Sequence, residues 1–123
     1  MPTELINEKQ MRVAGWLMRS LINCHNSPDQ KITSDQILYK IRNNGLKMDG
    51  GQLREIIGHI RRNDLCAPGF ILSDNSGYWY SEDVAEMEKV WDSELSRARN
   101  ILQNFNPLRR RVKHLKNQKE AIL

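Results

Sequence analysis

The sequence is poor in the residues from which metal centres and disulfide frameworks are built. Its 123 residues include two cysteines, Cys24 and Cys66, and three histidines. There is no C-x-x-C motif and no cluster of His and Cys at ligand spacing. We therefore expect no metal and no cofactor, and we expect both thiols to be free and buried, as free cysteines usually are.

Catalytic signatures are also missing. The Ser, His and Asp residues form no nucleophile-and-base pattern, and no Gly-rich loop of the kind that holds phosphates is present. These absences predict a protein that is not an enzyme.

Long apolar runs are absent as well. No stretch of about 18 apolar residues occurs, so we expect no membrane-spanning helix. The amino terminus lacks the basic-then-apolar layout of a secretory signal. The composition, 39% hydrophobic and 28% charged, is that of a folded chain, which we place in a cytoplasm.

Basic charge is concentrated at the carboxyl end. The net charge is +4, but residues 81–106 hold three Lys or Arg and six Asp or Glu, whereas residues 107–123 hold six Lys or Arg and one acidic residue. Such a basic segment is suited to meeting phosphates or acidic protein, or it serves only to keep the chain soluble.

Two capping signals stand close together in the first half of the chain. Thr33 and Gln36 fit a capping box, and Asp49 and Gln52 repeat the pattern. Between them, Gly45 allows the positive φ of a left-handed helix end. The sequence therefore predicts two short helices, over residues 34–42 and 50–63, joined by a turn.

The apolar residues of the second of these helices follow the helical repeat without a miss. They are Leu53, Ile56, Ile57 and Ile60, and they predict which side of the helix is buried. The opposite side then carries small and polar residues, which are Gly51, Glu55, Gly58 and Arg62, flanked by Gln52, Arg54, His59 and Arg61.

A longer helix is predicted before this pair and a hairpin after it. Residues 6–24 place an apolar stripe on one side, formed by Ile6, Val13, Leu17, Leu21 and Cys24. Two aromatic and aliphatic runs, residues 70–72 and 78–80, enclose a turn over residues 73–77 and predict a β-hairpin. Lys31 and Ile32 are long enough only for a very short strand.

The chain then continues into a helix with a coiled-coil-like repeat. Its apolar positions are Val84, Met87, Trp91, Leu95, Ala98, Leu102 and Phe105. Asn106 and Pro107 interrupt the pattern, either as the cap and first residue of a new helix or as a kink. The stripe either folds back onto the rest of the domain or pairs with its copy in a second subunit.

The order of these segments resembles that of a winged-helix DNA-binding domain. The segments are the helix ending in Arg61 and Arg62, the strand at residues 70–73, the turn closing at Gly77 and the run Tyr78-Trp79-Tyr80. The chain is similar to small phage and prophage winged-helix proteins whose wing leads into a Ser-Glu-Asp cap and a long heptad helix. The resemblance covers about residues 30–105. It implies a mainly α fold with a small β-hairpin: a winged helix-turn-helix at residues 1–81, a long helix at 82–106 and a basic tail at 107–123.

The resemblance also implies a DNA-binding surface. The helix at residues 50–63 would enter the major groove, and the hairpin tip at residues 73–77 would lie near the sugar-phosphate backbone. The residues expected to contact double-stranded DNA are Gln52, Arg54, Glu55, His59, Arg61 and Arg62 in the groove, with Lys40, Lys47, Asn75, Arg109, Arg110 and Arg111 along the backbone. The implied function is that of a phage-type regulator or replication accessory in a bacterial cytoplasm. If residues 82–106 pair with a second copy, the dimer would need a DNA site with two-fold symmetry.

A second class of function stays open. Glu55 places a carboxylate in the middle of the outward side, and the hairpin tip, Asp74-Asn75-Ser76, has no Lys or Arg to attract phosphate. Both features favour a protein-interaction module that binds a host or phage protein.

Overall fold

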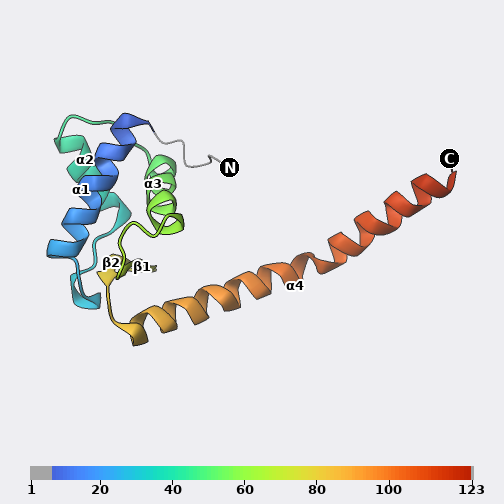
Figure 1. Cartoon of the computed structure of the whole chain (residues 1–123). Coiled ribbons are helices and arrows are strands. Elements are labelled where there is room, and N and C mark those ends of the chain that lie inside the picture. Colours follow the sequence, from blue (N-terminus) through green and yellow to red (C-terminus); the bar gives the residue numbers. More distant parts are fainter. Residues whose placement is uncertain (1–6, 123) are drawn as a thin grey trace. The chain divides into compact units, whose positions relative to one another are not determined.

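The computed structural model describes residues 7–122, with side chains up to residue 119. Three helices, a two-stranded hairpin and one long helix follow one another along the chain (Figure 1). The fold is mainly α with a small β-hairpin and a long C-terminal helix, as the sequence predicts. In order, the elements are α1 (Glu8–Cys24), the short 3₁₀ turn η1 (Pro28–Gln30), α2 (Ser34–Asn43), α3 (Gly50–Arg62), β1 (Phe70–Asp74), β2 (Gly77–Ser81) and α4 (Val84–Ile122).

Reciprocal capping fixes where the short helices begin. The side chains of Thr33 and Asp49 accept the backbone N–H of Gln36 and Gln52, and each glutamine accepts the N–H of its cap residue in return. Both predicted capping boxes are confirmed. Asn7 caps α1 in the same way, while the predicted stripe residue Ile6 lies outside the described residues. Gly45, with φ of +82°, provides the left-handed end after α2.

The core forms where the apolar stripes of α1, α2 and α3 meet. The four predicted α3 residues are all buried, with Ile56 fully so, and they pack with Leu17 and Leu21 of α1 and Ile37 of α2. The periodicity of each helix therefore places its apolar side inward, and the outer side of α3 is left exposed as a consequence.

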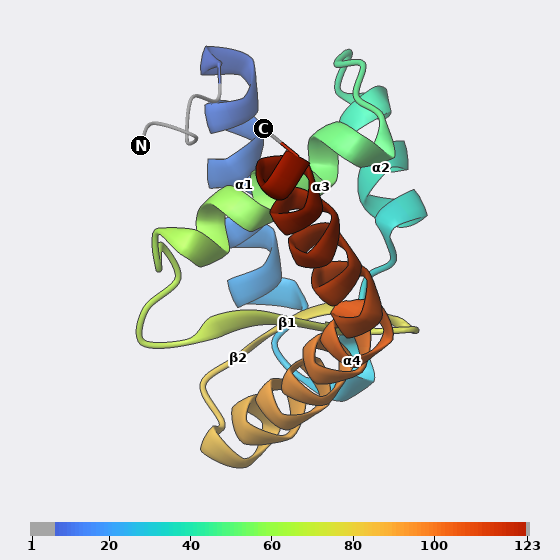
Figure 2. The same cartoon turned by 90° about the vertical axis from the view of Figure 1, so that its right-hand side faces the viewer.

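The hairpin lies beneath these three helices in Figure 2. Its strands pair from Phe70 with Ser81 to Asp74 with Gly77, so the turn holds two residues rather than the five predicted. A third segment joins it: Ile32 and Tyr78 exchange backbone hydrogen bonds of 3.0 and 2.8 Å, which confirms the very short strand.

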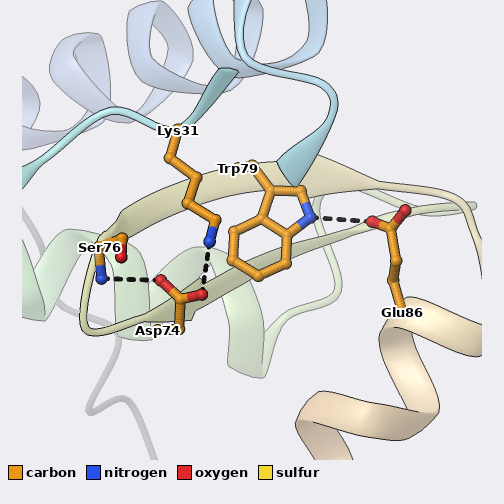
Figure 3. Close-up of polar contacts among 5 residues, drawn as sticks. All are labelled: Lys31, Asp74, Ser76, Trp79 and Glu86. Atoms are coloured by element: carbon orange, nitrogen blue, oxygen red, sulfur yellow. Dashed lines mark hydrogen bonds and ion pairs between the residues drawn. The ribbon is translucent and has the colours of Figure 1, made fainter. Parts of the chain in front are cut away.

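The hairpin leads straight into α4. The Asp83 carboxylate accepts the N–H of Glu86, which confirms the predicted cap, and the indole N–H of Trp79 donates to the Glu86 carboxylate at 2.9 Å (Figure 3). The Trp79 side chain that makes this contact is buried, with 5% of its surface exposed. The first turns of α4, up to Val90, thus belong to the same compact unit as the helices and the hairpin.

From Trp91 onward, α4 forms a second compact unit of its own. It continues as one helix through Pro107, so Asn106 does not cap a new helix and that interpretation is wrong. Proline removes one backbone N–H from the helix and its ring crowds the carbonyl four residues earlier, at Gln103, which bends a helix without ending it when the turns on both sides are intact. None of the helices in the described part of the chain is long and apolar enough to cross a membrane.

The two cysteines differ in exposure. Cys66 is buried, as expected, but Cys24 is exposed, and the expectation that it is buried is wrong. Leu21 is the last α1 residue enclosed by the core, and Cys24 stands one turn further on, at the very end of the helix.

We expect a thiol reagent to modify one cysteine per native chain. Cys24 should react at the rate of an accessible thiol, whereas Cys66 is shielded by burial. Burial, together with the charge of Asp64, also raises the pKa of the Cys66 thiol, which favours the unreactive protonated form. Mass spectrometry of peptides after timed maleimide labelling measures both rates. Equal labelling of the two residues in the absence of denaturant would contradict the structure.

Candidate functional site

The outer side of α3 carries six of the predicted site residues. Gln52, Arg54, Glu55 and Arg62 are exposed on it, and His59 and Arg61 are partly buried at its carboxyl end. This side is opposite to the buried stripe, so α3 presents it to solvent without disturbing the core.

Two arginines of this surface lie along the helix, over glycines. A β-carbon built at Gly58 would stand 2.8 Å from Nη1 of Arg62, and one at Gly50 would stand 3.5 Å from Nη1 of Arg54. Helical side chains lean toward the amino terminus, which brings each guanidinium over the residue four positions earlier. The glycines therefore leave room for the arginines, and both guanidinium groups stay on the outer surface.

Arg61 is used differently from its neighbour. Its Nε donates to the carbonyl of Ile71 at 2.9 Å, its Nη2 donates to the hydroxyl of Ser73 at 3.0 Å, and its guanidinium lies 5.9 Å from the centre of the Tyr78 ring. The arginine joins the end of α3 to the hairpin. It does not extend freely into solvent, as the sequence suggests for a residue flanking the outer side.

Two further predicted residues are engaged locally. The side-chain oxygen of Gln52 accepts the N–H of Asp49 at 3.0 Å as part of the capping box. A bidentate contact with adenine uses both ends of a glutamine amide, so this arrangement leaves only one end for it. His59 has its Nδ1 3.3 Å from the side-chain nitrogen of Asn63, in the last turn of α3.

The hairpin tip carries a compensated charge rather than a basic one. Lys31 donates to the Asp74 carboxylate at 2.6 Å and lies 4.9 Å from the centre of the Trp79 ring (Figure 3). The hydrogen bond from Lys31 holds the pKa of the Asp74 carboxyl below its usual range, and the N–H of Ser76 adds to this. Asn75 is exposed at the turn and is the one predicted contact residue there.

Further cations lie outside α3. Lys47, in the segment that connects α2 to α3, is exposed, as is Lys40 on α2. The structure adds Lys9, whose ammonium group donates to the backbone carbonyl of Lys47 at 2.6 Å. The two lysines are 38 positions apart, so no local sequence pattern could have placed Lys9 at this site.

The basic cluster of the tail belongs to α4. Arg109, Arg110 and Arg111 are all exposed in the second compact unit, within a continuous helix. Among the residues with described positions, no group of three or more His, Cys, Asp or Glu is arranged to hold a metal ion.

Comparison with known proteins gives no relative from which a function could be transferred. No family model matches the chain, and no curated protein or solved structure is significantly similar to it. The functional argument therefore depends on the geometry of these side chains.

Proposed function

We propose that the protein binds double-stranded DNA as a winged helix-turn-helix, with α3 in the major groove. The support is the combination of α2, a turn and α3 with a hairpin directly after them, in which the buried stripe of α3 leaves its other side open. That open side carries Arg54 and Arg62. An α-helix fits the major groove of B-form DNA, and helix-turn-helix domains insert their second helix in this way.

The observation that carries the proposal is the placement of the two guanidinium groups over glycines. Both arginines are exposed on the outer side of α3, and the glycines beneath them let each guanidinium lie close against the helix. Guanidinium groups bind phosphate oxygens, or the O6 and N7 atoms of guanine, through paired hydrogen bonds. Glu55, between them, is suited to accept from a cytosine amine.

Positive charge outside α3 would contribute without reading sequence. Lys9, Lys40 and Lys47 are suited to phosphate contacts, and the Arg109 to Arg111 cluster would add attraction to any nucleic acid. The role that fits such a protein is that of a phage-type regulator or replication accessory, acting by occupying a DNA site.

We expect Arg54→Ala and Arg62→Ala each to weaken binding to duplex DNA by roughly tenfold, because each removes a charged contact worth about 1–3 kcal/mol. Fluorescence anisotropy with a random duplex, followed by a genomic target once footprinting finds one, measures the loss. The affinity for the random duplex should fall as salt rises, with a slope reduced by about one in each variant.

Two substitutions serve as controls. Lys89→Ala removes an exposed cation of α4 that the proposed contact surface does not include, and it should leave affinity unchanged. Glu55→Gln removes a negative charge from the surface and should raise affinity for the random duplex. Absence of binding at low salt, or binding that is insensitive to salt, would overturn the proposal.

The alternative, a protein-interaction module on the same scaffold, has its own support. Arg61 is used inside the molecule, and Lys31 is neutralised by Asp74, so the hairpin contributes little positive charge. If duplex DNA does not bind, the mixed-charge surface of α3 would be the docking site for a host or phage protein.

A further inference from the structure

The second compact unit leaves a row of large apolar side chains uncovered. Trp91 is 64% exposed and Phe105 is 59% exposed, although both are aromatic. The other large members of the row that are more than 40% exposed are Ile101, Leu102, Leu108, Val112 and Leu115. Such a row of large apolar residues on a soluble chain marks a contact surface.

The row keeps one heptad register through Pro107. Counting in sevens from Val84 gives Trp91, Ala98, Phe105 and Val112, and counting in sevens from Met87 gives Ile101, Leu108 and Leu115 with a single departure at Glu94. These two series are the a and d positions of a coiled coil that reaches residue 115, and they differ from the predicted stripe in placing Glu94 and Ile101 where the prediction had Leu95 and Leu102. Because the helix is continuous through residue 107, the seam is continuous as well.

Charge is divided unevenly along the same helix. Its first part carries Glu86, Glu88, Asp92 and Glu94 against Lys89, and its last part carries Arg109, Arg110, Arg111, Lys113, Lys116 and Lys119. The helix therefore has an acidic end and a basic end, and the apolar row runs through both.

We propose that α4 pairs with α4 of a second copy of this chain, in antiparallel orientation. Antiparallel pairing sets the acidic part of each helix beside the basic part of the other, so the charges attract at both ends of the pair. It buries the exposed aromatic and aliphatic side chains of both copies in one seam.

A parallel pair is disfavoured by the same residues. In a parallel, in-register coil each seam residue faces its own copy, so Glu94 would meet the partner copy's Glu94, and the basic ends would lie together. Like charges held this close repel, whereas the antiparallel pair brings Ala98, Ile101, Leu102 and Phe105, near the middle of the helix, to the centre of the contact. The small side chain of Ala98 permits a close approach there.

Self-association is tested first by sedimentation equilibrium of the full chain without DNA. We expect a dimer whose dissociation constant rises with salt, since screening weakens the attraction between the two ends. Ile101→Glu, which places a charge in the seam, should raise the dissociation constant at least about tenfold. The matched variant Gln103→Glu adds the same charge on the outer side of the helix and should leave it unchanged. A chain that stays monomeric at high micromolar concentration would overturn the proposal.

The orientation is tested by pulsed electron spin resonance on labelled dimers. Spin labels at Ser93→Cys, Gln103→Cys and Lys113→Cys, in a Cys24→Ser background that leaves only buried Cys66, each report the distance to the same site in the partner. With a rise of 1.5 Å per residue, an antiparallel pair centred near residue 101 separates the labels along the axis by about 25 Å at position 93, by little at 103 and by about 35 Å at 113. Equal distances at all three sites would mean parallel pairing and would overturn the proposal. Neither test involves DNA, so its result is separate from that of the DNA-binding measurements.

Discussion

Gly77→Ala is expected to lower the free energy of unfolding by about 2–4 kcal/mol, because the new β-carbon adds a steric clash to backbone strain. Gly77 has φ of +139°, a conformation that residues with a side chain rarely adopt. A β-carbon there would stand 2.6 Å from the carbonyl oxygen of Ile32, which accepts the N–H of Tyr78. The substitution should therefore separate the hairpin from the segment before α2.

Urea unfolding measures the loss, and Gly45→Ala is the matched control. Gly45 also has a positive φ, of +82°, but no atom lies within 4 Å of its would-be β-carbon. Its substitution should cost only the conformational part, about 1 kcal/mol. Hydrogen exchange at the amides of Ile32 and Tyr78 should accelerate in the Gly77 variant and not in the Gly45 variant. Equal effects of the two substitutions would mean that the close approach at Gly77 contributes nothing.

Arg61→Ala is expected to destabilise the protein by about 2 kcal/mol, since it removes two charge-assisted hydrogen bonds from a partly buried position. The carbonyl of Ile71 and the hydroxyl of Ser73 lose their donors, and the ring of Tyr78 loses its cation. Because these partners belong to the hairpin, its attachment to α3 weakens. Thermal unfolding followed by circular dichroism measures the change.

The neighbouring residue provides the contrast. Arg62→Ala removes an exposed side chain that lies over Gly58, so its effect on stability should stay within about 0.5 kcal/mol. Arg61→Lys keeps the charge but not the two-directional donor geometry, and it should recover only part of the stability. If Arg61→Ala melts like the wild type, the contacts with the hairpin are unimportant in solution.

Local sequence patterns were sufficient for the starts of the two short helices, but they did not show that α4 continues through Pro107 as one helix. Thr33 with Gln36, and Asp49 with Gln52, predict the starts of α2 and α3 because a capping box involves residues only three positions apart. The stripe of isoleucine and leucine in α3 predicts its buried side for the same reason, because the helical repeat joins residues only three or four positions apart. The helix-turn-helix pair and the exposed side of the candidate site followed from these two signals.

Contacts between distant parts of the chain could not be predicted in this way. Arg61 was expected beside Arg62 on an open surface, but a hydrogen-bond partner ten positions later draws it to the hairpin. The pairing of Lys31 with Asp74 and the position of Lys9 beside Lys47 span still longer separations. Cys24 fits the stripe of α1 by its spacing, yet periodicity does not show at which residue of α1 the neighbouring elements stop covering the helix.

The three tryptophans give the protein separate optical reporters. Trp16 lies partly covered against the helical core, Trp79 is buried within strand β2 of the hairpin, and Trp91 is largely exposed to water. An indole emits at shorter wavelength as water is removed from around it, so a chain with Trp91→Phe would show the state of the core and hairpin without a contribution from α4. The spectrum of Trp91, obtained by difference, would shift to the blue when that helix becomes covered. Loss of the hairpin and burial of the long helix can thus be followed as two independent changes in emission wavelength, the first in the Trp91→Phe chain and the second in the difference spectrum.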